Sequence, residues 1–200
     1  YLGRRFPRWQ IGVASFVGYA ISNNLGFALL SGTTARYRFY SRWGLSSSEL
    51  SRIVVFYSGT FWIGLMVLGG WGLLVHPPSG LPGVLHHGLA IPLGAILLAA
   101  SAAYAIASFT IRGPVRVFGF ALTIPSPALV AGQFALSTAD WALAVAVLWV
   151  LMPAPRLPFT ELMGAFVVAH ILGLISNVPG GLLVFEGGMT VLLGPAVAVT

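Results

Sequence analysis

The chain is poor in charge: it has no lysine and four acidic residues, and charged side chains make up only 7% of its 200 residues. A soluble domain takes about a quarter of its residues from the charged types, which keep its surface in water. Ten arginines and four acids cannot cover a globule of this length, so an ordinary soluble domain is excluded. Cysteine is also absent, which excludes disulfides and thiolate metal sites.

Apolar residues dominate what is present. They make up 58% of the chain, and the mean hydropathy is +0.92. Six apolar segments each approach the ~20 residues that cross about 30 Å of hydrocarbon. These segments cover residues 10–32, 53–75, 89–111, 128–152, 161–178 and 182–199. The sequence therefore predicts an all-α integral membrane protein, a polytopic helical bundle of about five to six apolar segments.

The ends of the chain indicate a fragment. It begins at Tyr1 without an initiator methionine and stops at Thr200 inside an apolar stretch. We therefore expect one transmembrane domain over residues 1–200, cut from a longer protein at both ends.

Two local patterns predict details of the helices. In the polar link 33–52, Ser46 and Glu49 have the spacing of a capping box, so the next helix is expected to begin near Ser47. Farther along, small residues recur every four positions, which predicts a ridge for close helix packing in lipid. This ridge consists of Ala99, Ala103 and Ala107.

The arginines predict how the first segment lies in the membrane. If every segment spans, the ten arginines divide four against six, which is hardly a bias. If segment 10–32 enters and leaves by the same face, nine arginines share one side and only Arg156 lies on the other. The second division fits the excess of positive charge in cytoplasmic loops, so we expect a re-entrant or broken first segment.

Two segments carry residues that interrupt a membrane helix. Asn23 and Asn24 place adjacent amides in the middle of segment 10–32, where they are costly unless they face protein or water. Pro179-Gly180-Gly181 cannot lie inside an undisturbed helix. Residues 21–29 and 175–183 share five identities, which fits chance similarity as well as an internal repeat. A repeat would indicate a translocation path, and its candidate residues are Asn23, Asn24, Asn177, Pro179, Gly180 and Gly181.

Charged residues supply the other candidates. Arg36, Arg38 and Arg42 alternate with Tyr37 and Tyr40, which suits either a phospholipid headgroup site or an ordinary cytoplasmic loop with an aromatic belt.

Two acids lie in apolar surroundings. Glu186 lies on the translocation path or returns to the interface, and the sequence leaves these alternatives equal. Asp140 also joins the candidate path, although a structural hydrogen bond is the favoured role. Glu161 suits a helix N-terminus.

Nothing in the sequence predicts a cofactor, a metal site or a nucleic-acid partner. His86 and His87 lie in a loop without further ligands nearby, and His170 suits a hydrogen bond between helices. Phosphate loops, zinc spacings and nucleophile elbows are absent from the sequence.

Two stretches resemble one bacterial family. Residues 22–64 read SNNLGFALLSGTTARYRFYSRWGLSSSELSRIVVFYSGTFWIG, and residues 177–186 read NVPGGLLVFE. Both are similar to the membrane domain of the multiple peptide resistance factor, the lysylphosphatidylglycerol synthase and flippase. The chain departs from the family at Leu183, where the family commonly has glycine.

The resemblance implies a multi-pass protein of the bacterial inner membrane that moves aminoacylated phosphatidylglycerol between leaflets. Arg36, Arg38 and Arg42 would hold the phosphate, and Glu186 would meet the cationic headgroup. The implied partners are phosphatidylglycerol and lysyl-phosphatidylglycerol, and a homo-oligomer stays open. Two alternatives remain: the membrane half of a lysyltransferase that presents lipid to a separate catalytic domain, and a transporter of another anionic lipid or solute.

Overall fold

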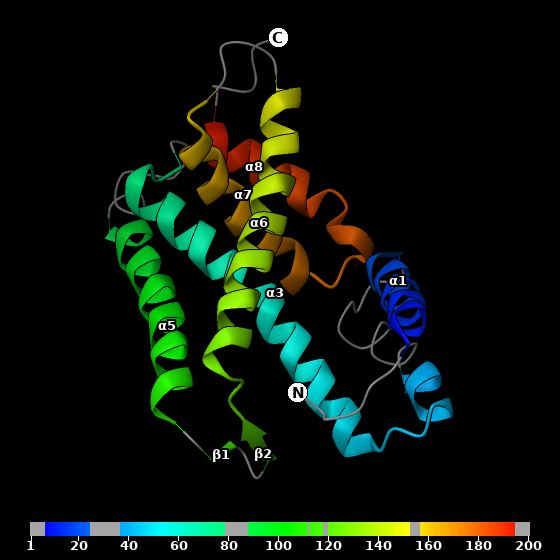
Figure 1. Cartoon of the computed structure of the whole chain (residues 1–200). Coiled ribbons are helices and arrows are strands. Elements are labelled where there is room, and N and C mark those ends of the chain that lie inside the picture. The colour runs from blue at the N-terminus through cyan, green and yellow to red at the C-terminus, as the bar shows by residue number, and fades with distance from the viewer. Residues whose placement is uncertain are drawn as a thin grey trace.

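The computed structural model describes residues 7–24, 37–78, 88–111, 113–117, 120–152 and 157–194. Its elements are α1 (Arg8–Asn24), α3 (Ser47–Val75), α5 (Ala90–Thr110), β1 (Pro114–Val117), β2 (Phe120–Thr123), α6 (Pro127–Leu151), α7 (Phe159–Ile175), the 3₁₀ turn η1 (Pro179–Gly181) and α8 (Val184–Leu193). The two strands form one short antiparallel hairpin. The predicted all-α membrane architecture is confirmed (Figure 1).

Three helices in the described part of the chain are long and apolar enough to cross a membrane: α3 with 29 residues, α5 with 21 and α6 with 25. They match the predicted segments 53–75, 89–111 and 128–152. The capping box at the start of α3 is also confirmed. The Ser46 hydroxyl accepts from the Glu49 backbone N–H at 3.3 Å, and the Ser46 N–H donates to the Glu49 carboxylate at 2.9 Å.

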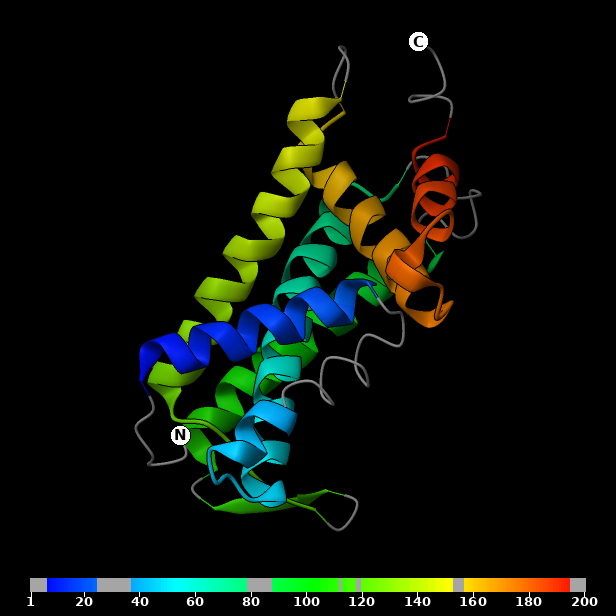
Figure 2. The same cartoon turned by 90° about the vertical axis from the view of Figure 1, so that its right-hand side faces the viewer.

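The arginine-rich segments gather at one end of the bundle. The start of α3, the helical residues 37–42 and the β1–β2 hairpin all lie there (Figures 1 and 2). Arg38, Arg42, Arg52 and Arg116 belong to these segments, as the count of loop charges predicts. If the arginine-rich face is the cytoplasmic one, as the sequence predicts, the β1–β2 hairpin end is the cytoplasmic end.

Helix α1 does not run with the three long helices. It is seen nearly end-on in Figure 1 and lies across the bundle in Figure 2. Its 17 residues cover the first part of the predicted segment 10–32, and residues 25–36 lie outside the described part of the chain. The orientation of α1 agrees with a first segment that does not span.

Helices α7 and α8 form a hairpin that returns to the end from which it started. Helix α7 begins where α6 ends, and α8 leads back to that same end (Figures 1 and 2). The sequence analysis expects about 20 residues in each of these segments, but α7 has 17 and α8 has 10. Ten residues rise only about 15 Å, half of the hydrocarbon thickness, so α8 is too short to cross a membrane by itself.

Glycines on α3 bring three other helices against its backbone. A Cβ atom on Gly72 would lie 2.6 Å from the backbone nitrogen of Gly164 in α7 and 2.8 Å from the Thr160 carbonyl oxygen. A Cβ on Gly70 would lie 2.9 Å from the Gly94 carbonyl oxygen in α5. Such contacts bring helices close enough for dispersion forces to hold them together in lipid.

The predicted alanine ridge of α5 is wrong for packing within this chain. Ala99 and Ala103 are exposed, and the buried residues of α5 are Ala90, Gly94, Ser101 and Ser108. Gly94 therefore supplies the close contact of α5 with α3, because glycine lets two helix backbones approach more closely than alanine does.

A polar network joins the three long helices inside the bundle. The Tyr104 hydroxyl of α5 lies 2.8 Å from Gln133 Oε1 of α6, and Gln133 Nε2 donates to the Thr60 hydroxyl of α3 at 2.8 Å. The amide of Gln133 is buried and its hydrogen bonds are satisfied, so it stabilises the arrangement instead of opposing it.

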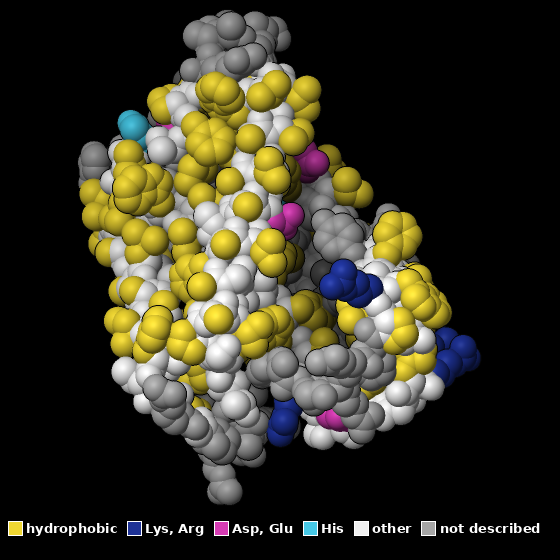
Figure 3. All heavy atoms as spheres, in the orientation of Figure 1, with side chains coloured by type: hydrophobic (Ala, Val, Ile, Leu, Met, Phe, Trp, Pro, Cys, Tyr) yellow, Lys and Arg dark blue, Asp and Glu magenta, His cyan; other side chains and the backbone are white. Residues whose placement is uncertain are grey.

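Large apolar side chains cover the outside of the long helices (Figure 3). Ile106 and Phe109 of α5 are 61% and 65% exposed, and Leu136 and Leu143 of α6 are 73% and 66% exposed. An apolar surface of this extent indicates contact with lipid tails.

The contact between α3 and α7 gives a prediction with an internal control. Gly72→Ala forces the two backbones apart and is expected to destabilise the protein by about 1–3 kcal/mol through overpacking. Gly59→Ala lies on the same helix with nothing within 4 Å and is expected to stabilise it by about 0.5–1 kcal/mol. Thermal unfolding in one detergent compares the variants, and equal midpoints would contradict the close approach.

Candidate functional site

The turn between α7 and α8 contains the predicted Pro-Gly-Gly break. Asn177, Gly180, Gly181 and Leu183 all have positive φ angles, between 55° and 67°. The Ser176 hydroxyl donates to the Gly173 carbonyl oxygen at 2.7 Å, and the Val178 N–H donates to that hydroxyl at 3.3 Å. Side-chain bonds of this kind satisfy part of the backbone that leaves the helix.

Small residues close the hairpin onto itself. A Cβ on Gly181 would lie 3.3 Å from the Gly173 Cα, and a Cβ on Gly188 would lie 3.2 Å from the Ala169 Cβ. Helix α8 therefore lies directly on α7. The turn is therefore packed against α7 on its inner side.

The two segments with predicted breaks meet in the structure. Helix α1 contacts η1, and the end of α1 beside the turn is the end that carries Asn23 and Asn24 (Figures 1 and 2). The predicted interruption at Asn23 and Asn24 is not found, because residues 21–24 are helical, and residues 25–36 lie outside the described part of the chain. The turn with Asn177, Pro179 and the two glycines therefore contacts a helix that lies far from it in the sequence.

The arginine-bearing residues 37–42 lie against the other side of α1. Ala14 of α1 is fully buried in a cluster with Tyr40, Leu45 and Leu50. Arg38, Arg42 and Tyr37 are exposed, whereas the ring of Tyr40 is buried and stacks edge-on against Trp43 at 5.5 Å. Arg36 lies outside the described residues. Helix α1 therefore connects the exposed arginines to the turn of the hairpin.

The two candidate carboxylates flank one aromatic cluster. Asp140 is exposed near the middle of α6, and Glu186 is exposed in the first turn of α8. Their neighbours in sequence, Trp141 and Phe185, both lie against His170 of α7, with ring centroids 4.7 and 6.3 Å away. Neither carboxylate makes an ion pair or a side-chain hydrogen bond within the described part of the chain. The hydrogen bond favoured for Asp140 is therefore not found there.

The electrostatic layout is visible on one face of the molecule. Acidic side chains lie over α6 and near α8 on the face shown in Figure 3, and an arginine side chain lies on the neighbouring part of the same face. Helix α8 also directs its N-terminal dipole at its first turn, which favours a carboxylate at Glu186. The acidic side chains can attract a cationic group, and the arginine can attract an anionic group.

The sequence analysis missed the aromatic cluster around His170. The His170 ring is stacked on Phe166 at 5.8 Å, and the Trp141 indole N–H donates to the Phe61 carbonyl oxygen at 3.0 Å. The spacing of four between Phe166 and His170 was the available signal, because it puts both rings on one helix face. Among the described residues, no group of three or more His, Asp or Glu side chains has the geometry of a metal site.

Comparison with known proteins gives relatives rather than an activity. No protein-family model matches the chain. It is 37% identical over 198 residues to the uncharacterized protein slr0712 of Synechocystis sp., a match that covers 98% of this chain and 61% of that protein. It is 29% identical over 198 residues to inner membrane protein YbhN of Escherichia coli, covering 96% of this chain and 61% of the relative. The chain thus spans about three fifths of either relative.

These findings and the three long apolar helices establish a membrane protein. They do not extend to the multiple peptide resistance factor, so the resemblance to that family stays a prediction.

The left-handed residue at the start of α8 gives a second prediction. Leu183 has φ 65° and is 84% exposed, so its side chain contributes little packing to offset the strain. Left-handed backbone costs an L-residue about 1–2 kcal/mol, and glycine escapes that cost but loses about 0.5–1 kcal/mol in chain entropy. Leu183→Gly is therefore expected to raise the unfolding midpoint slightly.

Leu182 provides the matched control for this substitution. It is also exposed, but its φ of −49° is ordinary, so Leu182→Gly is expected to lower the midpoint. Thermal unfolding in detergent measures both, and a lowered midpoint for Leu183→Gly would contradict the strain.

Proposed function

We propose that this chain is the translocating part of a bacterial inner-membrane flippase for anionic phospholipids of the phosphatidylglycerol class, including aminoacylated forms. The observation that carries the proposal is the meeting of α1 with the turn of the α7–α8 hairpin, beside the arginine-bearing residues 37–42. The similarity to an Escherichia coli inner membrane protein supports the location.

The lipid phosphate would bind first at the arginines. Arg38 and Arg42 are exposed at the cytoplasmic end, and the rings of Phe39, Tyr40 and Trp43 pack behind them. Guanidinium groups bind phosphate oxygens with paired, charge-assisted hydrogen bonds, and aromatic rings favour the headgroup level. Arg36 adds a third cation to the same stretch of sequence.

The headgroup would then pass the interrupted segments. A polar headgroup inside hydrocarbon needs polar partners, and irregular backbone is tolerated at membrane depth where it lines a cavity. The turn from Ser176 to Leu183 supplies such backbone, and helix α1, which ends at Asn24, contacts η1. Broken helices at the contact of two segments are typical of substrate sites in transporters.

The carboxylates would select for a cationic headgroup. Asp140 and Glu186 are exposed without an internal ion-pair partner in the described chain, and each is adjacent in sequence to a ring of the His170 aromatic cluster. An unpaired carboxylate at membrane depth is costly unless it serves a ligand or water. The ammonium groups of an aminoacyl headgroup can pair with such a carboxylate. Phosphatidylglycerol without an aminoacyl group has no ammonium group.

Transport in proteoliposomes tests these roles separately. The full-length protein is reconstituted with labelled phosphatidylglycerol or lysyl-phosphatidylglycerol, and a membrane-impermeant reagent reports the fraction in each leaflet. Arg38→Gln is expected to slow both lipids about tenfold, because both lose a charge-assisted hydrogen bond. Glu186→Gln is expected to slow the lysyl form and to speed phosphatidylglycerol, because it removes a negative charge that attracts ammonium and repels phosphate.

Glu161→Gln is the matched control, because Glu161 occupies the first turn of α7 as Glu186 occupies that of α8. It is expected to leave both rates unchanged. Wild-type rates for Arg38→Gln at equal reconstitution would refute the phosphate role, and equal slowing of both lipids by Glu186→Gln would refute headgroup selection.

A further inference from the structure

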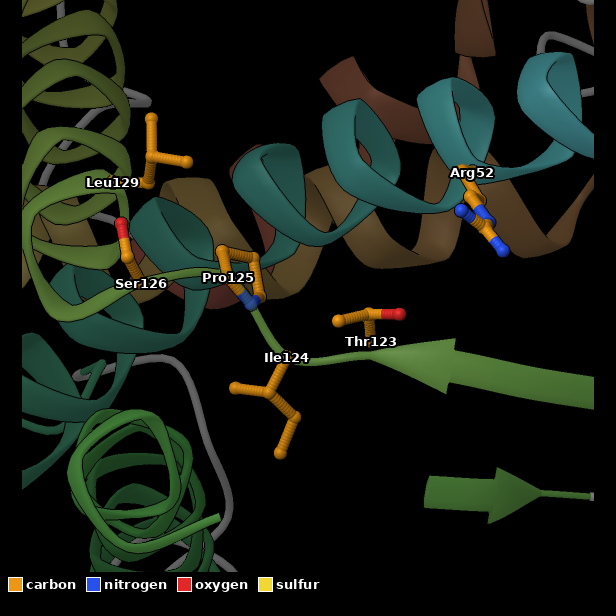
Figure 4. Close-up of a pocket in the computed structure, with 6 residues that line it drawn as sticks. All are labelled: Arg52, Thr123, Ile124, Pro125, Ser126 and Leu129. Atoms are coloured by element: carbon orange, nitrogen blue, oxygen red, sulfur yellow. The ribbon is translucent and has the colours of Figure 1, made fainter. Parts of the chain in front are cut away.

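A cationic pocket lies at the β1–β2 hairpin end of the bundle, away from the α7–α8 turn. It has a volume of about 290 Å³ and opens between the first turns of α3 and the start of α6. Its lining residues are Arg52, Thr123, Ile124, Pro125, Ser126 and Leu129 (Figure 4). This volume is at the lower end of small-molecule pockets and suits a compact headgroup.

One side of the pocket is polar and positively charged. The guanidinium of Arg52 points from α3 toward the strand end that carries Thr123 (Figure 4). Arg52 is exposed and makes no ion pair in the part of the chain that the structure describes. At the other end of the pocket, beside Leu129, Ser126 precedes α6 as its N-cap (Figure 4), and its side chain makes no capping hydrogen bond, so the hydroxyl is available to a ligand.

The other side of the pocket is apolar and continues into the lipid-facing surface. Ile124, Pro125 and Leu129 form it, and Leu129 is 40% exposed on the first turn of the membrane-spanning helix α6. A free phosphate ion would gain nothing from this wall. A glycerophospholipid presents a phosphate and an adjoining acyl chain in the same order, from the interface toward the hydrocarbon.

We propose that this pocket holds the phosphate group of an anionic phospholipid as a resident lipid of the cytoplasmic leaflet. Arg52 would bind the phosphate oxygens at one end of the pocket, the Ser126 hydroxyl at the other end would donate a hydrogen bond to the adjoining ester group, and Leu129 would contact the start of an acyl chain. The site is separate from the proposed transport path and does not depend on it, because binding here requires no translocation.

Substitutions at Ser126 test the site without disturbing α6. Aspartate and asparagine are both strong N-cap residues, so either one preserves the start of the helix. Ser126→Asp places a negative charge in the pocket, whereas Ser126→Asn keeps it neutral at similar size. Native mass spectrometry of the full-length protein, titrated with phosphatidylglycerol, is expected to show about tenfold weaker binding for Ser126→Asp and near wild-type binding for Ser126→Asn.

Arg52→Gln is expected to weaken phosphatidylglycerol binding about tenfold, and Arg116→Gln on the neighbouring strand β1 removes the same charge as its control. Equal losses from these two variants would indicate diffuse attraction and overturn the proposal. So would equal binding by Ser126→Asp and Ser126→Asn.

Inorganic phosphate and phosphatidylcholine distinguish the source of the phosphate. Phosphatidylglycerol is expected to outcompete both, because only it combines net negative charge with an acyl chain. Displacement of phosphatidylglycerol by inorganic phosphate at equal concentration would assign the pocket to a soluble ligand and overturn the lipid assignment.

Discussion

The glycine-lined surface of α3 is the constraint on which the rest of the structure depends. Lipid tails are as apolar as the side chains between helices, so burial alone does not hold a membrane bundle together. Close backbone approach is needed, and α3 provides it at Gly70 against Gly94 of α5 and at Gly72 against Gly164 of α7. Gly64 gives the same approach to α6, where an added Cβ would meet the backbone of Ser137. These contacts fix three neighbours around one helix, and the Gln133 network then sets their alignment.

The contacts of α3 also determine where the α7–α8 hairpin lies. Because α7 is pressed against α3, the short α8 needs only to fold back on α7, which Gly173, Gly181 and Gly188 permit. A ten-residue helix with a strained turn would be marginal alone, since isolated short helices are unstable. Its packing against α7 stabilises the left-handed residues of the turn, including Leu183. The turn between α7 and α8 is thus strained locally and supported from one side.

The sequence predicted the features that depend only on neighbouring residues. The three long helices follow from apolar length, the start of α3 from Ser46 and Glu49, and the helix break from Pro179, because each depends on neighbours in sequence. The alanine ridge failed because spacing alone does not say which face of a helix meets a partner. The contact of α1 with the turn and the pocket at Arg52 and Ser126 each join residues far apart in the chain, and no local pattern encodes such a meeting.

The distribution of charge bears on which lipid the proposed path would carry. Arginines sit at one end of the bundle, whereas Asp140 and Glu186 are exposed beside the aromatic cluster of the hairpin. A phosphate that leaves the arginines would approach these carboxylates and be repelled, and the repulsion grows as water is excluded. A headgroup that also carries ammonium groups reverses this interaction, because its cations are attracted to the carboxylates that repel its phosphate. The same side chains that would hinder phosphatidylglycerol would therefore assist its aminoacylated form, so selectivity and passage would arise from one set of charges.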